Sequence, residues 1–240
     1  MSEQISPNEH GAVGPKLEER GGLRQINWPP QGGTRKVMAL PQSLEPISNA
    51  VHLSVDMQNI FARGGIWETP WMERVLPAIV AIAELNPPRA VFTRFVTPLN
   101  AEDRPGRWQR YFTRWDCATR SRLPSAQLEI VAPLCRLIPP ATVIDKPAYS
   151  AFAESGLTAF LRDRNVETLI ITGSETDVCV LATVLDAVDL GYRVIVVEDA
   201  LCSSFDQGHD ALMTLYRNRF SEQIELMTQA QVSELWRDPL

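Results

Sequence analysis

An acid, an amine and a thiol each stand directly after an apolar, β-branched run, at Asp56, Lys146 and Cys179. Together these groups can form a nucleophilic site, because a thiolate attacks carbonyl carbons and a nearby cation lowers the pKa of the thiol. The acid would take the thiol proton and later protonate a leaving amine. Each residue also has an ordinary explanation: a turn cap for Asp56, a solvated lysine for Lys146, and a small buried residue for Cys179. From these positions alone, the catalytic and the ordinary interpretations have equal standing.

The segment around Cys179 has the sequence ETLIITGSETDVCV, from Glu167 to Val180. The apolar run 168–172 predicts a strand, Gly173 and the polar residues after it predict a tight turn, and the following residues have helical spacing. Cys179 would then stand at a helix start, where backbone N–H groups and the positive end of the helix dipole favour a thiolate. The same N–H groups could stabilise an oxyanion.

Strand-like and helix-like segments alternate along the chain. The predicted strands cover residues 51–56, 89–96, 141–145, 168–172, 193–198 and 223–227, and the predicted helices 71–85, 126–138, 154–165, 180–192, 207–220 and 229–236. This alternation predicts an α/β fold of three layers, α/β/α, with a mainly parallel, Rossmann-like sheet. The carboxyl ends of its strands share one edge, and ligands bind there. The sequence has neither GxGxxG after the first strand nor GxxxxGK[ST], so dinucleotide and P-loop functions lack support.

The connection 97–125 is too long for a plain loop in a compact domain. Its large aromatic residues recur at helical spacing, at Trp108, Tyr111, Phe112 and Trp115, and its arginines recur on another side, at Arg104, Arg107, Arg110 and Arg114. The pattern predicts a short helix with an aromatic face. That face could pack on the body of the protein or on a partner subunit, or the helix could cover the substrate as a lid.

Residues 1–48 are rich in glycine, proline and polar residues, and we interpret them as an extended N-terminal arm before a domain at 49–240. Trp28 and the segment 37–40 could dock on the body or on a neighbouring subunit. A mobile tail is the equal alternative.

The composition limits the class of protein. Of 240 residues, 45% are hydrophobic and 22% charged, which is typical of a globular protein with a full core. The net charge of -6 argues against nucleic acid or an anionic membrane as partner. Four cysteines without CxxC spacing indicate reduced thiols in the cytoplasm. We find neither an apolar run of the roughly 18 residues that a membrane span needs nor a secretion signal.

Three motifs resemble those of the isochorismatase-like cysteine hydrolases. They are VDMQNIF (Val55–Phe61), DKPAYSAF (Asp145–Phe152) and GSETDVCV (Gly173–Val180), and the resemblance runs from about residue 50 to 230. It implies the isochorismatase-like hydrolase fold, a catalytic triad of Asp56, Lys146 and Cys179, and dimers, tetramers or other homo-oligomers. It also implies a cis peptide between Ser174 and Glu175, an oxyanion hole of the Glu175 and Cys179 N–H groups, and a pocket aromatic at Phe61.

The chain departs from this family's nicotinamidases at their metal ligands. The segment after the second strand is Arg94-Phe95-Val96-Thr97-Pro98, and the three histidines, His10, His52 and His209, are poorly placed to meet in one site. We therefore expect no metal ion and no cofactor. Family members that hydrolyse a vinyl ether often lack the cysteine, so Cys179 favours an amide-type substrate.

The expected function is that of a metal-independent cysteine amidohydrolase acting on a small amide, ureide or carbamoyl compound through a thioester. We expect substrate contacts from Phe61, Trp108, Tyr149 and Phe152. Arg94 could bind a substrate carboxylate or form a structural salt bridge. Two alternatives remain: a vinyl ether hydrolase in which Cys179 is a bystander, and a catalytically silent member that binds a metabolite or partner through the 97–125 insert.

Overall fold

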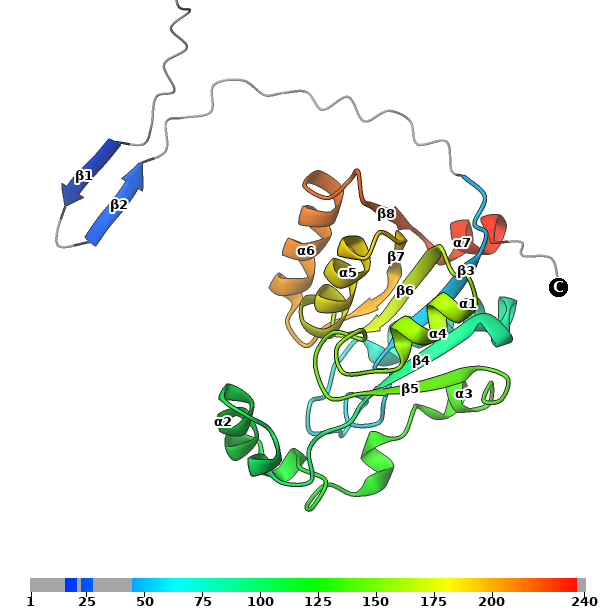
Figure 1. The fold of residues 1–240 in the computed structure, drawn as a ribbon, viewed down its shortest axis with the longest axis horizontal. Helices are drawn as coiled ribbons and strands as arrows, with labels where there is room; N and C mark the ends of the chain where they lie inside the picture. The colour runs from blue at the N-terminus through cyan, green and yellow to red at the C-terminus, as the bar shows by residue number, and fades with distance from the viewer. Residues whose placement is uncertain (1–15, 21–22, 28–44, 237–240) are drawn as a thin grey trace, which may run out of the picture. The chain divides into compact units, whose positions relative to one another are not determined.

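The strands of the central sheet are short, rich in β-branched residues and buried, as expected for strands covered on both faces. They are β3 (Ala50–Val55), β4 (Ala90–Phe95), β5 (Thr142–Lys146), β6 (Thr168–Ser174), β7 (Arg193–Cys202) and β8 (Ile224–Met227). The computed structural model describes residues 16–20, 23–27 and 45–236. In it these strands form one parallel sheet in the order β5-β4-β3-β6-β7-β8 (Figure 1). The predicted parallel sheet is confirmed.

Helices cover both faces of the sheet, so the predicted three-layer architecture is confirmed (Figure 1). One layer contains α1 (Met72–Leu85), α3 (Ala132–Cys135) and α7 (Gln229–Leu235), and the other contains α4 (Leu157–Asp163), α5 (Leu181–Asp189) and α6 (Asp206–Asn218). Because strand side chains alternate between faces, Ala50 belongs to the first core and Val51, Leu53 and Val55 belong to the second.

The strand order reverses between β3 and β6. From β3 the chain builds outward through β4 to β5, then returns to the other side of β3 with β6. In an open parallel sheet, a crevice forms outside the carboxyl ends of the strands at such a reversal. Asp56 follows β3 directly, and Cys179 lies five residues beyond the end of β6.

The predicted helix over 126–138 is wrong. The chain there forms a 3-10 turn at Ser125–Leu128, an isolated bridge between Ile130 and Gln58, and the single turn α3. The side-chain amide of Gln58 also donates to the Leu128 carbonyl at 2.8 Å. These contacts hold the backbone of 128–130 in a non-helical path, so tertiary pairing overrides the local pattern. Other 3-10 turns lie at Pro87–Arg89, Ala101–Asp103 and Asp116–Ala118.

The insert contains the predicted short helix, α2 (Arg107–Arg114). Its aromatic side packs on this chain's own core, where Phe112 is fully buried and Trp108 and Tyr111 are half-buried. The arginines of this helix, Arg107, Arg110 and Arg114, are exposed.

The chain divides into two units, Met1–Ser43 and Leu44–Leu240. The first contains an antiparallel pair that the sequence analysis did not predict, β1 (Lys16–Arg20) and β2 (Leu23–Asn27). Trp28 and the segment 37–40 lie outside the described residues. Near the start of the second unit, the Ile47 N–H donates to the Leu235 carbonyl at 3.1 Å. Within the described ranges, no helix has the length and apolar character to cross a membrane.

Candidate active site

Asp56 and Lys146 form a fully buried ion pair at the carboxyl edge of the sheet. The Lys146 Nζ and the Asp56 Oδ2 are 2.6 Å apart, and neither side chain has exposed surface. Thr93 on β4 holds the acid: its hydroxyl donates to Asp56 Oδ1 at 2.6 Å and accepts the Asp56 N–H at 3.0 Å. The left-handed backbone of Asp56, with φ of 50°, ends the strand at this point.

The Lys146 ammonium has three oxygen partners, as many as it has protons. Besides Asp56, it donates to the backbone carbonyls of Ala148 and Tyr149, both at 2.9 Å. It also lies 5.1 Å from the centre of the Phe95 ring. Burial by itself lowers the pKa of Lys146, but its interactions with Asp56 and Cys179 outweigh this effect, so the pKa is raised. The side chain therefore stays an ammonium.

Cys179 lies in the first turn of the helix that follows β6. The peptide bond between Ser174 and Glu175 is cis, and Thr176–Val180 forms a π-helical turn that continues into α5. The N–H groups of Val178 and Val180 both donate to the Glu175 carbonyl at 3.1 Å. Cys179 is 6% exposed.

The Cys179 thiol interacts with both members of the ion pair. Burial raises the pKa of Cys179 well above its ordinary value, Lys146 opposes this, and Asp56 adds to it. Sequence reasoning expected a thiolate stabilised by the helix start and the lysine. The structure corrects this, because removal from water outweighs the cation. The resting group is a thiol beside a carboxylate, an arrangement in which proton transfer accompanies nucleophilic attack.

Aromatic rings from several segments surround this group. Tyr149 and Trp108 have ring centres 4.8 Å apart, and Trp108 lies 6.5 Å from Phe95, the partner of Lys146 in the β4–β5 register. Trp67 contacts Phe61 at 5.9 Å, and it joins three further rings, Phe95, Tyr111 and Trp115. Three of the expected contact residues, Phe61, Trp108 and Tyr149, thus belong to one aromatic cluster.

Sequence reasoning missed Trp67 and the role of Tyr111 as site residues. Burial is the largest cause that raises the pKa of Tyr111, and the neighbouring Tyr149, Glu175 and Cys179 raise it further. The Tyr111 phenol is therefore within electrostatic range of the thiol. The signal available for Trp67 was an aromatic residue in the loop after the first strand, six positions beyond Phe61.

Arg94 lies on the other face of the sheet. In the β4–β5 register Arg94 pairs with Asp145 and Phe95 pairs with Lys146, so Arg94 and Lys146 point to opposite faces. The Arg94 guanidinium binds both Asp145 oxygens, at 2.7 and 3.0 Å, and Glu129 at 3.3 Å. The structure therefore favours a structural salt bridge over contact with a substrate carboxylate.

Phe152 is also directed away from Asp56, Lys146 and Cys179. Its ring stacks on Tyr192, with centres 6.0 Å apart, and packs against the core beneath α5. Tyr192 precedes β7, at the amino end of the strands, whereas those three residues lie at the carboxyl end. The expectation that Phe152 contacts substrate is corrected.

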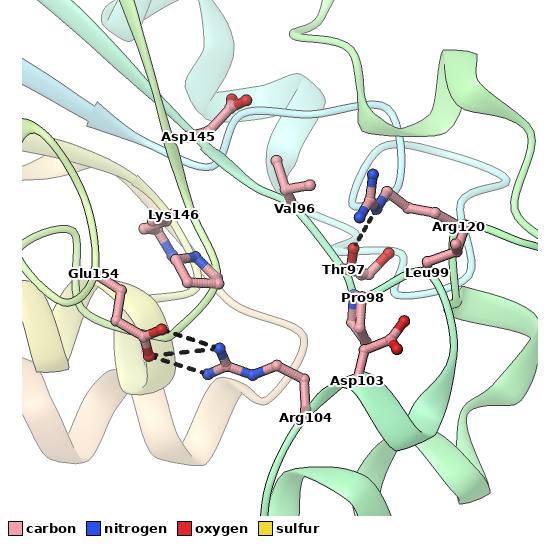
Figure 2. A pocket seen from close by; sticks show the side chains of 11 residues that line it. Val96, Thr97, Pro98, Leu99, Asp103, Arg104, Arg120, Asp145, Lys146 and Glu154 are labelled. Atoms are coloured by element: carbon pink, nitrogen blue, oxygen red, sulfur yellow. Dashed lines mark hydrogen bonds and ion pairs between the residues drawn. The ribbon is translucent and has the colours of Figure 1, made fainter.

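A hollow of about 570 Å³ adjoins the lysine end of the site (Figure 2). Its wall includes Lys146, Arg104, Arg120 and Glu154. Arg104 binds Glu154 at 3.3 Å and lies 5.7 Å from the centre of the Trp108 ring. Arg120 donates through Nε to the Thr97 carbonyl at 2.8 Å. The ion pair ties the insert to the loop after β5.

Among residues 45–236, no three His, Cys, Asp or Glu side chains lie close enough together to hold a metal ion. His52 is on β3 with its Nε2 2.8 Å from the Thr172 hydroxyl, and burial lowers its pKa to about 3. His209 is on α6 with its Nδ1 2.9 Å from the Thr176 hydroxyl. The imidazole rings of His52 and His209 thus each contact a different threonine.

Comparison with known proteins places these features in a wider group. Residues 50–228 match the model of the isochorismatase domain. A probable inactive nicotinamidase of Arabidopsis thaliana is 30% identical, over 68% of this chain and 85% of that protein. The ureidoacrylate amidohydrolase RutB of Methylorubrum extorquens is 29% identical, over 70% of this chain and 77% of that protein. An uncharacterized isochorismatase family protein of Bacillus subtilis is 36% identical over 34% of this chain, and the match spans 44% of its own length.

The solved structure of a cysteine hydrolase from Pseudomonas syringae pv. phaseolicola has the same fold. It superposes with a TM-score of 0.68 and 24% identity, over 79% of this chain and 93% of that chain.

Proposed function

Since the chain belongs to the isochorismatase family, we propose that it is a cysteine amidohydrolase. It cleaves the C–N bond of a small amide, ureide or carbamoyl compound through a thioester and releases ammonia or an amine. The observation that carries this proposal is the buried Asp56–Lys146 pair, 2.6 Å long, beside the Cys179 thiol. The amidohydrolase activity in the name of the RutB relative supports the same class of substrate.

The first half of the reaction forms the thioester. The Asp56 carboxylate takes the thiol proton as the Cys179 sulfur bonds to the substrate carbonyl carbon. The carbonyl oxygen becomes an oxyanion, for which the backbone N–H groups of Glu175 and Cys179 are the donors. The C–N bond then breaks, and the nitrogen leaves with the proton from Asp56.

The second half restores the thiol. Asp56 takes a proton from water as the water oxygen attacks the thioester carbon, and the Cys179 sulfur leaves and recovers that proton. The sum is amide plus water giving acid plus amine. Throughout, Lys146 remains charged and stabilises whichever neighbour, carboxylate or thiolate, carries the negative charge.

The aromatic cluster supplies the substrate contacts in this proposal. Phe61, Trp108 and Tyr149 form the apolar wall that excludes water from the reacting carbonyl, and a drier site strengthens each electrostatic contact within it. The chemistry requires no metal ion, so a chelator should leave the activity unchanged. Stoichiometric zinc or iron in active protein would contradict this part.

A screen for ammonia release tests the function. Small amides, ureides and carbamoyl compounds are assayed with wild type and with Cys179→Ala. We expect at least one substrate to release ammonia with wild type and to lose that release with the variant. Pyruvate released from isochorismate, with full activity in Cys179→Ala, would favour the vinyl ether hydrolase instead.

The silent-member alternative has a separate test, because one relative is named a probable inactive nicotinamidase. Under our proposal, iodoacetamide in alkaline solution modifies Cys179 and abolishes activity, whereas modification of the exposed Cys117 and Cys135 alone leaves activity intact. A Cys179 that resists iodoacetamide while the screen stays negative would favour a protein that binds without catalysis.

A further inference from the structure

The charged groups around the thiol indicate which class of substrate the site accepts. This inference rests on the proposed function. We propose that Glu175 makes this site select uncharged or cationic amides and discriminate against anionic ones. Glu175 would then be a residue that determines specificity, distinct from the part its backbone N–H plays in the proposed oxyanion hole.

Glu175 stands one turn before the nucleophile. It follows β6 directly, and its carbonyl accepts the N–H groups of Val178 and Val180 on either side of Cys179. Its side chain is held in place because Oε1 accepts the Ser204 N–H at 3.0 Å. The residue is half-buried, so its charge is incompletely screened by water.

The carboxylate shares its neighbourhood with two phenols, which in turn interact with the thiol. The pKa values of Tyr111 and Tyr149 are both raised. Burial is the largest cause, and neighbours that include Glu175 and Cys179 add to it. Both phenols are therefore neutral at physiological pH. Asp56 and Lys146 balance each other at 2.6 Å. Glu175 is thus the uncompensated charge within this group of residues.

Three arginines of the adjoining segments already have other partners. Arg94 binds Asp145 and Glu129 on the opposite face of the sheet. Arg104 binds Glu154 and Arg120 binds the Thr97 carbonyl, both at the hollow (Figure 2). Arg94 and Arg104 are therefore each balanced by a carboxylate. Arg120 and the arginines of α2 are exposed, so water and salt screen their charges.

Matched thiol reagents test the charge preference directly. Methanethiosulfonates react with Cys179 to form a mixed disulfide and release methanesulfinate, and they exist as trimethylammonium-ethyl and sulfonato-ethyl forms of similar size. The second-order rate of each reagent at Cys179 is measured by peptide mass mapping. It is divided by the rate of the same reagent with 2-mercaptoethanol, a free uncharged thiol. We expect the cationic reagent to react roughly 10- to 100-fold faster than the anionic one, with the ratio falling in high salt.

Two glutamate variants locate the charge responsible. Glu175→Gln keeps an acceptor for the Ser204 N–H. It should make the normalised rates of the cationic and the anionic reagent nearly equal, as they are for 2-mercaptoethanol. Glu84→Gln removes an exposed carboxylate near the end of α1, at the amino end of the strands, and should leave the ratio unchanged. An anionic reagent that reacts as fast as the cationic one, or a ratio that Glu175→Gln does not change, overturns the proposal.

Turnover separates this proposal from the function on which it rests. Once the screen has identified an amide substrate, kcat/KM is compared for succinamic acid and for its uncharged methyl ester. We expect the ester to be preferred. Preference for the acid overturns the role of Glu175 and leaves the amidohydrolase function intact. A strong charge ratio at Cys179 with no amide hydrolysed supports the role of Glu175 and counts against the amidohydrolase.

Discussion

The ammonium of Lys146 and the carboxylate of Asp56 lie 2.6 Å apart, with neither side chain exposed to solvent. Two buried charges at this distance stabilise each other only as a pair, since each alone would carry a large desolvation cost. The β3 and β5 strand ends supply one charge each, on either side of β4. The pair therefore links the folding of the sheet edge to the chemistry at the thiol.

Asp56→Asn should lower both stability and turnover. It leaves the Lys146 charge buried and unpaired, so the free energy of unfolding should fall by about 3–5 kcal/mol. The proton acceptor is also lost, so kcat should fall far more than KM changes. Urea unfolding and steady-state kinetics measure these effects. The double variant with Lys146→Met should unfold less easily than Asp56→Asn. Near wild-type turnover in Asp56→Asn would refute the acid–base role.

The rate of alkylation of Cys179 should keep rising with pH above the range in which an ordinary thiol ionises. Burial raises the pKa of Cys179 well above its ordinary value, so the reactive thiolate accumulates only in alkaline solution. Lys146→Met should shift the profile to still higher pH, because it removes the cation that opposes this rise. Folding stability should decline as pH rises above about 8.5, where an unfolded thiol already ionises. A rate that levels off below pH 8 would contradict the assignment.

Thr183→Val should impair catalysis from outside the site. The Thr183 hydroxyl donates to the Cys179 carbonyl at 2.7 Å and accepts the Ala151 N–H at 3.0 Å. It thereby joins the nucleophile's turn to the loop whose carbonyls hold Lys146. We expect a loss of about 1–3 kcal/mol in stability, and a lower kcat with a shifted pH profile of alkylation. Thr183→Ser should restore both, whereas an unchanged profile in Thr183→Val would leave the residue a purely structural role.

Arg94→Ala should alter stability modestly and leave substrate binding unchanged. Its ion pairs with Asp145 and Glu129 are partly exposed, so water screens them and the loss should be about 1 kcal/mol or less. Because the guanidinium lies on the face opposite Lys146, KM should stay within about twofold of wild type. A tenfold increase in KM for an anionic substrate would restore Arg94 as a substrate contact.

Replacing Trp108 and Trp115 together by Ser should lower activity. Trp108 contacts Tyr149 and Trp115 contacts Trp67, so the wall beside the thiol loses two supports. Both rings are half-buried, so each contributes at most on the order of 2 kcal/mol. The family resemblance also leads us to propose a homo-oligomer that this insert helps to assemble. Sedimentation velocity decides that part: a wild-type monomer at micromolar concentration, or a monomeric variant with full activity, would exclude it.

The sequence by itself determined the order of the elements and singled out the candidate reactive groups. Alternating apolar runs and helical periods are local, so they located β3 to β8 within a few residues, and the aromatic spacing located α2. Asp56, Lys146 and Cys179 were found because each follows a strand, and parallel strand ends share one edge. The cis peptide between Ser174 and Glu175 was expected from the resemblance of motifs alone.

Only the tertiary structure decided how these residues meet. The register between β4 and β5 directs Arg94 to one face and Phe95 to the other, and no local pattern specifies that register. Phe152 packs beside Tyr192, 40 residues away in the sequence. The thiol pKa follows from the balance between burial and Lys146, because desolvation and charge distance depend on atoms that only folding brings together.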